Sequence, residues 1–139
     1  MGFFDFLSKK KPKEHFTEVQ KSDNPFEVGT NLYNAGNDCI RQGKFQDAIG
    51  WYDAALKDSP GLKEAWYNKG LALSELGRFT EAIECYDKVL AIDPNNANAW
   101  EYRADSLDKQ GRHEEATYSL AKAFDIQKKI VEDQITRKI

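Results

Sequence analysis

The chain lacks several features that define common classes of protein. Its 139 residues include two cysteines, Cys39 and Cys85, which are too few for the disulfide framework of a small secreted domain. No stretch approaches the roughly 18 apolar residues that a membrane-spanning helix needs. Basic residues are not in excess, since 20 lysines and arginines stand against 23 acidic residues, a net charge of −3. A dedicated nucleic-acid binder, whose affinity rests on surplus basic side chains, is therefore not expected.

Motifs for catalysis and cofactor binding are also missing from the sequence. It has no glycine-rich phosphate loop, no dinucleotide fingerprint, no His-Glu-x-x-His and no Cys-x-x-Cys. The two histidines are His15, near the amino terminus, and His113, at an expected turn. Cys39 and Cys85 occupy non-equivalent places, and buried free cysteines commonly act as small apolar residues. We therefore expect a protein without catalysis, metal or cofactor, located in the cytoplasm.

What the sequence does contain is an internal repeat with a period of 34 residues. Residues of the same kind recur at this interval in the sets Gly43/Gly77/Gly111, Ala48/Ala82/Ala116, Tyr52/Tyr86/Leu120 and Leu32/Trp66/Trp100. So many matches at one interval indicate a repeat architecture, in which each unit is one supersecondary element that stacks on its neighbours.

Each unit has the pattern of two helices joined by a turn. Apolar residues recur at helical spacing over 29–42, 63–76 and 97–110, and again over 45–58 and 79–92. A glycine follows each first stretch, where a left-handed residue ends a helix without a Cβ penalty. Pro60 and Pro94 end the second stretches, because the residue before proline is pushed out of the helical region. The sequence therefore predicts an all-α fold.

The spacing and the residue types resemble the tetratricopeptide repeat. The second unit matches that family's pattern at Trp66, Gly70, Leu73, Gly77, Ala82, Tyr86, Val89 and Pro94. The first unit departs from it at Leu32 and Cys39, and the third has Lys128 in place of the closing proline. The resemblance covers about residues 29–126 and implies a right-handed superhelical stack of three antiparallel helix pairs. Repeats are expected at about 29–62, 63–96 and 97–130, within a domain spanning 24–139.

Residues 1–23 lie before the repeats and combine an aromatic start with a basic stretch. We expect a flexible tail over these residues. One alternative is that Phe3, Phe4 and Leu7 contact a membrane, with the lysines of 9–13 against anionic headgroups, although a single short turn binds weakly. The other alternative, which we favour slightly over the membrane, is that this segment docks into a groove of its own or of a neighbouring copy. Asn24 can cap a helix that begins at Pro25.

At the other end, neither glycine nor proline interrupts the last helix. From Glu114 an apolar series continues to Ile139, which predicts a single helix of about 25 residues. We expect it to fold over the third repeat as a cap, since terminal repeats need a polar outer face. The alternative is an exposed stripe of Ile130, Val131 and Ile135 that pairs with a second chain.

The resemblance also implies a binding surface, because the first helix of each pair in tetratricopeptide proteins lines a concave side that binds peptides. The matching residues that we assign to this groove are Tyr33, Asn34, Asn37, Arg41, Glu64, Tyr67, Asn68, Leu71, Glu75, Glu101, Tyr102 and Asp105. Thr30, Asn98, Asp108 and Lys109 share these faces. Asparagine both donates to and accepts from a peptide backbone, and tyrosine supplies flat contact area with a polar tip. Five carboxylates against one arginine and one lysine predict a basic or polar partner.

One branch of the family binds the acidic C-termini of heat-shock chaperones through two lysines, an arginine and two asparagines. Asn37 and Asn68 match the two asparagines, but Tyr33, Asn98 and Tyr102 stand in place of the basic members. The sequence therefore predicts a non-catalytic protein–protein interaction module that binds a peptide or protein segment in its groove. The alternative is a self-assembling structural protein, a homo-oligomer in which the N-terminal tail or the C-terminal helix packs on a neighbouring copy.

Overall fold

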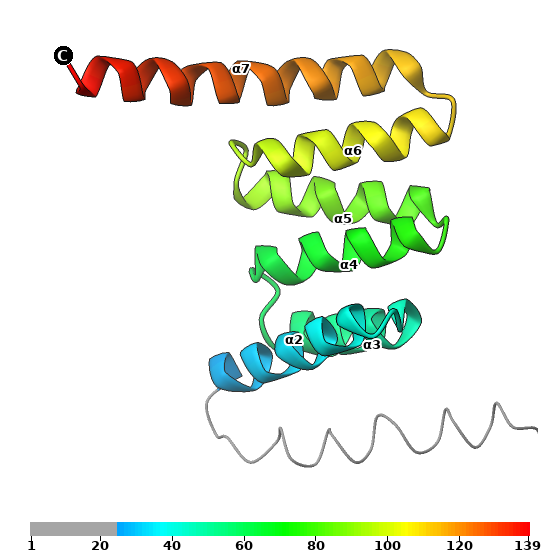
Figure 1. The fold of residues 1–139 in the computed structure, drawn as a ribbon. Coiled ribbons are helices and arrows are strands. Elements are labelled where there is room, and N and C mark those ends of the chain that lie inside the picture. Colours follow the sequence, from blue (N-terminus) through cyan, green and yellow to red (C-terminus); the bar gives the residue numbers. More distant parts are fainter. Residues whose placement is uncertain (1–24) are drawn as a thin grey trace, which may run out of the picture.

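A computed structural model describes residues 25–139, so the tail predicted over 1–23 and the capping residue Asn24 lie outside the described residues. The described part contains helices and turns only (Figure 1). The helices are α2 (Pro25–Arg41), α3 (Phe45–Asp58), α4 (Lys63–Glu75), α5 (Phe79–Ile92), α6 (Ala97–Lys109) and α7 (His113–Arg137). The predicted bounds of α3 and α5 are confirmed, and each first helix ends one residue before its predicted end. The all-α fold is confirmed as an α-α superhelix.

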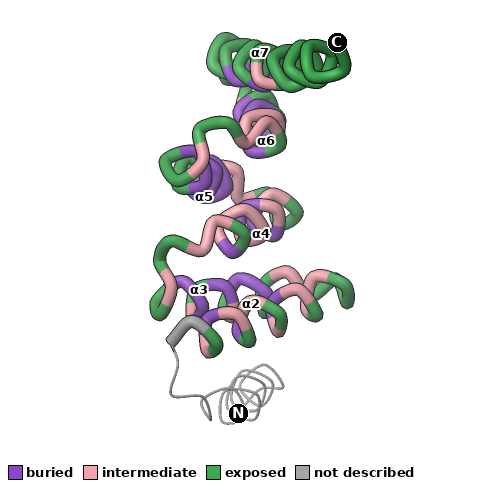
Figure 2. Tube along the Cα trace, turned by 90° about the vertical axis from the view of Figure 1, so that its left-hand side faces the viewer, coloured by how far each residue is buried: buried purple, intermediate pink, exposed green. Residues whose placement is uncertain are grey.

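The helices follow one another in a stack, and this stack is concave on the side of the first helices. Each helix packs against the next one in the chain, from α2 and α3 through to α6 and α7. The first helices α2, α4 and α6 also contact one another in sequence, whereas the second helices α3, α5 and α7 of the described part do not. Because the first helices lie closer together, the stack curves towards them, and their faces form the hollow side. Buried residues lie where neighbouring helices face each other (Figure 2).

The turn inside each pair depends on a glycine. Gly43, Gly77 and Gly111 have φ between 71° and 76°, a left-handed conformation in which a side chain would be strained. The amide of the following residue donates back to the end of the first helix, as Arg78 N does to Leu73 O at 2.9 Å. The 34-residue glycine repeat is therefore a repeat of helix ends, as the sequence predicts.

Within a pair, the two helices approach through a glycine and a tyrosine ring. A Cβ atom at Gly36 would lie 2.5 Å from Tyr52 Cε1, and one at Gly70 would lie 2.6 Å from Tyr86 Cε1. Both tyrosines are completely buried. The third pair has Ala104 at the glycine position and Leu120 at the tyrosine position, so a larger residue on one helix accompanies a smaller one on the other.

Successive pairs are joined by contacts that repeat with the sequence. Lys69 on α4 pairs with Asp53 on α3 at 2.6 Å, and the equivalent Arg103 on α6 pairs with Asp87 on α5 at 2.7 Å. Trp66 and Trp100 likewise donate their indole N–H groups to the carbonyl oxygens of the prolines six residues earlier, at 2.8 and 3.0 Å. These bonds fix the angle between one pair and the next, and so set the curvature of the concave side.

The last helix covers the third repeat over part of its length. Helix α7 has 25 residues, the predicted length, but only its first half packs on α6, where Ala116, Ser119 and Ala123 are buried. Ile130, Val131 and Ile135 are exposed, and the second half extends beyond the other helices (Figure 1). The first half of α7 therefore covers α6, while farther along the helix Ile126, Ile130 and Asp133 border a hollow shared with Pro94, Asn95 and Trp100. In residues 25–139 no helix is both long enough and apolar enough to cross a membrane.

Candidate functional site

The concave side carries a hollow of about 190 Å³ that is lined by all three first helices. Tyr33 of α2 forms one wall, and Glu64, Tyr67 and Asn68 of α4 form the centre. Asn98, near the start of α6, closes the far side. All five residues were assigned to the faces of the first helices from the sequence. The structure therefore brings residues 65 positions apart in the chain to one surface.

Asn37 and Asn68 are bonded to each other at the floor of this surface. The side-chain amide of Asn68 donates to Asn37 Oδ1 at 2.9 Å and to the hydroxyl oxygen of Tyr33 at 3.2 Å. Asn37 Oδ1 also accepts a hydrogen bond from the Tyr52 hydroxyl at 2.7 Å. An asparagine side chain has two N–H donors and one acceptor oxygen with two lone pairs. The donors of Asn68 and the acceptor of Asn37 are therefore occupied by bonds within the described residues.

Tyrosine rings continue from this pair along the stack. Tyr67 packs edge-on against Tyr102, with 5.7 Å between ring centres, and against Tyr86 at 6.3 Å. Tyr86 also stacks on Tyr102 at 6.2 Å. Such offset and edge-on arrangements of rings are favourable beyond the area that they bury. The apolar part of the concave surface is thus held rigid by contacts between neighbouring repeats.

Burial changes the acidity of these tyrosines. Removal from water raises the pKa of Tyr67 to about 12, because the charged phenolate is costly to desolvate, and the neighbouring Tyr102 adds to the effect. Burial also raises the pKa of Tyr52 and of Tyr86. All three phenols are therefore neutral at physiological pH and act as hydroxyl donors or acceptors.

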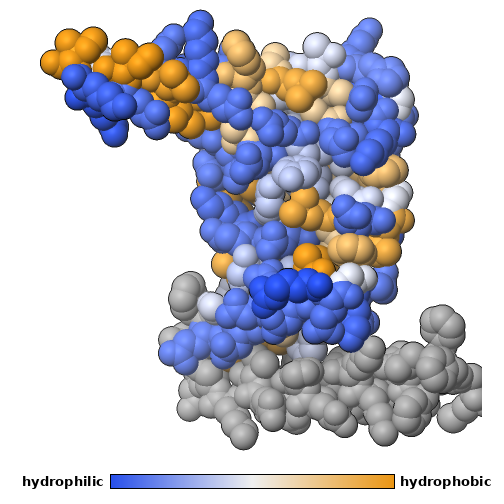
Figure 3. Space-filling model, in the orientation of Figure 1, coloured by the Kyte–Doolittle hydropathy of each residue, from blue (hydrophilic) through white to orange (hydrophobic). Residues whose placement is uncertain are grey.

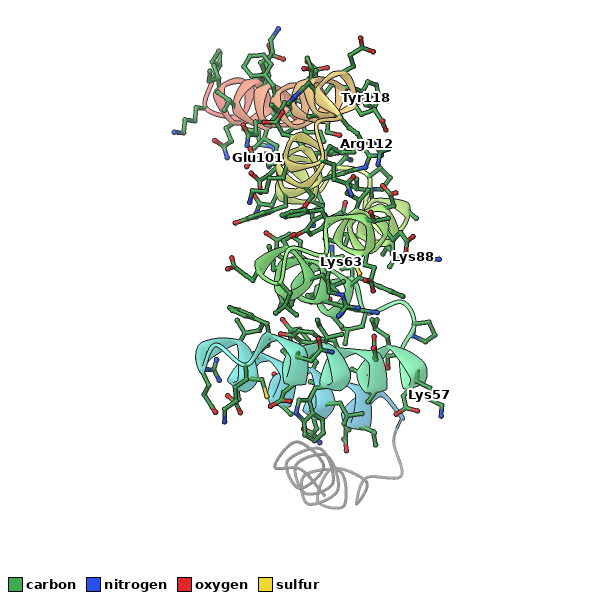
Figure 4. The ribbon with its side chains drawn as sticks, turned by 90° about the vertical axis from the view of Figure 1, so that its right-hand side faces the viewer. Lys57, Lys63, Lys88, Glu101, Arg112 and Tyr118 are labelled. Carbon is green, nitrogen blue, oxygen red and sulfur yellow. The ribbon has the colours of Figure 1, made fainter. Side chains whose placement is uncertain are left out.

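Several charges of the predicted surface have partners within the protein. Lys109 pairs with Asp105 at 2.9 Å, and Arg41 pairs with Asp38 one turn earlier on the same helix. Gln127 Nε2 donates to Glu101 at 2.8 Å, a bond that leaves the glutamate charge in place. Glu101 on α6 and Lys88 on α5 lie on opposite sides of the stack (Figure 4). Because the two basic residues of the surface are each paired with a carboxylate, its remaining charge is negative.

The predicted site residues do not all gather in the hollow. Tyr33, Glu64, Tyr67 and Asn68 line it, and Asn37 lies beneath it through its bond to Asn68. The other predicted residues lie outside the hollow, on α2, α4 and α6: Asn34, Arg41, Leu71, Glu75, Glu101, Tyr102 and Asp105. The reason is that the hollow occupies the end of the surface at which α4 and α6 begin, while these side chains are distributed along the helices.

Two residues of the hollow were missed from the sequence. Asn96 caps α6 by accepting a hydrogen bond from Ala99 N at 3.0 Å, and it also faces the hollow. Lys63 starts α4 and pairs with Asp93 at 3.1 Å, so a carboxylate partly neutralises its charge. Asn96 directly precedes a helical stretch, a position at which asparagine is favoured as a cap. In the sequence this position points to the start of a helix, and it gives no sign that the side chain also faces the hollow. The Lys63–Asp93 pair joins residues 30 positions apart and leaves no local signal.

The cysteines and the acidic residues do not form a reactive or metal-binding cluster in the part of the chain that the structure describes. In residues 25–139, no group of three or more His, Cys, Asp and Glu side chains could hold a metal ion. Cys85 is buried, and burial raises the pKa of its thiol to about 11. Cys39 is partly buried, and burial also raises its pKa. A raised pKa disfavours the thiolate that acts as a nucleophile.

A stack of antiparallel helix pairs with a concave side lined by first helices defines an α-helical repeat protein. Profiles described as tetratricopeptide repeat match residues 64–96 and 85–118, and one described as TPR repeat matches 36–77. Together they span 36–118, and the chain belongs to the tetratricopeptide repeat family. The resemblance seen in the sequence is thus confirmed.

Solved structures share the fold. A crystal structure of MamA has a TM-score of 0.76 at 21% identity, covering 91% of this chain and 75% of that one. The TPR domain of Arabidopsis OM64 has a TM-score of 0.73 at 21% identity and covers 84% and 100%. The second TPR of Spaghetti (RPAP3), bound to an HSP90 peptide, has 0.68 at 17% identity and covers 70% and 91%. No curated protein matches the sequence.

Proposed function

We propose that the chain is a non-catalytic interaction module that binds an extended, basic peptide segment of a partner protein on its concave side. The observation that carries the proposal is the pair Asn37 and Asn68. Their internal bonds use the N–H groups of Asn68 and the side-chain oxygen of Asn37, and no bond in the described residues uses the Asn68 oxygen or the Asn37 N–H groups. RPAP3, a protein of the same fold, was solved with a peptide bound. That precedent supports a peptide as the class of ligand, while the sequence of the ligand follows from the surface of this chain.

The two asparagines offer complementary groups to the N–H and C=O of one residue in an extended peptide, which point to the same side of the chain. The free N–H groups of Asn37 can donate to a backbone carbonyl, and the Asn68 oxygen can accept from a backbone N–H. An extended peptide exposes both groups, and such main-chain bonds provide affinity without requiring a particular side chain. Tyr33 and Tyr67, on either side in the hollow, supply flat apolar contact to the same segment.

Charge favours a basic ligand over the acidic C-termini that chaperone-binding relatives of the family recognise. Glu64 lines the hollow, and Glu101 and Glu75 lie farther along the first helices. Lys63, the basic residue that lines the hollow, is paired with Asp93. Lysine or arginine side chains in a ligand would be attracted to this surface, and the attraction would weaken as salt screens it.

Fluorescence anisotropy with two synthetic peptides of equal length tests this proposal. A labelled lysine-rich peptide should bind the full chain, more weakly as the salt concentration rises, whereas a glutamate-rich peptide should not. The double variant Glu64→Gln/Glu101→Gln should weaken binding of the lysine-rich peptide by about tenfold, which corresponds to about 1.4 kcal/mol.

The matched control is Glu84→Gln, which removes one exposed carboxylate from α5 on the opposite side. It should leave binding of the peptide unchanged, although the net charge of the chain changes in the same direction. Equal binding of both peptides, or equal loss in the control, would contradict the proposal. Preference for the glutamate-rich peptide would instead favour an acidic ligand of the chaperone type.

A further inference from the structure

The outer face of α7 exposes apolar side chains at positions that are buried elsewhere in the stack. Leu120 and Phe124 are 53% and 65% exposed. Their equivalents one repeat earlier, Tyr86 and Leu90, are 0% and 9% exposed, because they pack where α6 follows α5. The outer face of α7 therefore presents a junction surface that no other described helix covers.

This apolar stripe continues along the part of α7 that extends beyond the body. Val131 and Ile135 follow Leu120 and Phe124 on the same face of the helix, and both are more than half exposed. The space-filling view shows apolar side chains at this projecting end (Figure 3). The stripe thus has one half attached to the body and one half that projects from it.

The spacing of the stripe is the same when it is read in either direction. Intervals of four, seven and four residues separate Leu120, Phe124, Val131 and Ile135. A two-fold interface requires that residue i contacts residue j while j of the same chain contacts i of the partner. Two antiparallel α7 helices meet this condition, since Leu120 of one copy then faces Ile135 of the other, and Phe124 faces Val131.

We propose that the chain forms a two-fold homodimer through this stripe, with the two α7 helices antiparallel. The projecting half of each α7 packs on the other copy in the way that α6 packs on α5. It also has the direction of α6 in that packing, because α6 runs antiparallel to α5 at the internal junction (Figure 1). The dimer therefore repeats the packing between successive helix pairs, which the chain already has between α3 and α4 and between α5 and α6.

The opposite end of the stack argues against open, head-to-tail assembly. Such assembly needs a second exposed apolar face that fits the stripe. Leu32, the largest buried apolar side chain of α2, is 1% exposed. Among the residues whose burial is described, the exposed large apolar side chains lie on α5, α6 and α7, at Leu76 after α4 and at Ile139 after α7, and none lies on residues 27–41 or on α3. A closed dimer is thus favoured over a growing chain.

Light scattering coupled to gel filtration tests the dimer on the full chain. The wild type should have twice the chain mass of 15.9 kDa and should dissociate on dilution. Phe124→Glu and Val131→Glu should each give a monomer with an unchanged helical circular dichroism spectrum, because both side chains are exposed in the single chain. The control Ile92→Glu, at an exposed apolar position on α5, should remain dimeric.

Disulfide trapping tests the register. In a Cys39→Ser/Cys85→Ala background, the double variant Leu120→Cys/Ile135→Cys should form a covalent dimer under mild oxidation. Leu120→Cys alone should not, because the two copies of residue 120 lie about 22 Å apart along the axis. A wild type that is monomeric at every concentration, polymers that grow with concentration, or trapping by the single variant would each overturn the proposal. None of these outcomes bears on peptide binding, which involves the other side of the stack.

Discussion

The side-chain amide nitrogen of Asn68 lies 2.9 Å from Oδ1 of Asn37, a bond that joins α4 to α2 across the first junction of the stack. The second junction has no equivalent, because the corresponding positions carry Tyr102 and Leu71. There Ser74 instead bonds Ser106 at 3.2 Å and Tyr86 at 3.3 Å. The two junctions therefore offer different polar groups, and we propose the first, with its asparagine pair, as the place for main-chain recognition.

Removing the Asn68 side chain should weaken the fold by a modest amount. Asn68→Ala loses the bonds to Asn37 and Tyr33, and a partly exposed hydrogen bond contributes about 1 kcal/mol. We expect the free energy of unfolding, measured by urea titration, to fall by about 1–2 kcal/mol. The exposed Asn34 is the control, and its replacement by alanine should change stability by less than about 0.5 kcal/mol. Equal effects of the two substitutions would show that the bond across the junction is not stabilising.

The glycine–tyrosine contact within a pair predicts a rescue. Gly70→Ala places a Cβ 2.6 Å from Tyr86 Cε1, and overpacking of this kind costs about 1–3 kcal/mol. The third pair already combines Ala104 with Leu120, so the double variant Gly70→Ala/Tyr86→Leu should be more stable than the sum of the two single changes predicts. A double-mutant cycle from urea unfolding measures this coupling, and a value near zero would contradict the close contact.

Gly50 supplies the control for the glycine substitution. It lies within α3, and a Cβ at this position would meet nothing within 4 Å. Alanine lowers the entropy of the unfolded chain and favours helix, so Gly50→Ala should stabilise the protein by about 0.5–1 kcal/mol. If Gly50→Ala raises the free energy of unfolding and Gly70→Ala lowers it, the loss at Gly70 is due to the contact with the Tyr86 ring.

Buried tyrosines predict a loss of stability in alkali. The pKa of Tyr67 is raised from 10.0 to about 12 in the folded chain, and that of Tyr86 is raised as well. The folded state therefore keeps phenol protons that the unfolded state loses above about pH 10. The stabilisation is fully present below pH 10 and is lost as the pH rises towards 12. The free energy of unfolding, measured in urea, should be lower at pH 11 than at pH 8.5. In the Tyr86→Phe variant this decrease should be smaller than in the wild type, and an equal decrease in both would contradict this cause.

The two cysteines should react at different rates. Burial raises the pKa of the Cys85 thiol to about 11, and Cys39 is the less buried of the two. At pH 8 an alkylating reagent such as iodoacetamide should modify Cys39 first, and Cys85 only when the chain opens or urea is added. Mass spectrometry of tryptic peptides gives both rates. Equal rates in the native protein would mean that the Cys85 environment in the α4–α5 pair is open.

The repeat made most of the fold predictable. The residues that recur every 34 positions determine where the helices end. Gly43, Gly77 and Gly111 follow the first helices with positive φ, and Pro60 and Pro94 follow the ends of the second helices. Each cause acts within a few residues and repeats, so the bounds of α3 and α5 could be predicted to the residue. The length of α7 was also predictable, because nothing interrupts its helical pattern.

The path of α7 and the composition of the hollow were less predictable. Whether Ile130 and Val131 fold against the body depends on elements beyond the end of the third pair, which the sequence of the helix does not specify. Lys63 and Asn96 reach the hollow because helix starts from two repeats meet there, a relationship between residues 33 positions apart. Asn68 was assigned to the surface, but its bond to Asn37 depends on the exact angle between pairs.

The most direct test of the central claim, that the concave side binds an extended basic segment, is a nuclear magnetic resonance titration. The full chain, labelled with nitrogen-15, would be titrated with the synthetic lysine-rich peptide. The account predicts shifts of the side-chain amide signals of Asn37 and Asn68 and of backbone signals in α2, α4 and α6, with α3 and α5 little changed. Shifts confined to α3, α5 or the outer face of α7, or no shifts at saturating peptide, would contradict it.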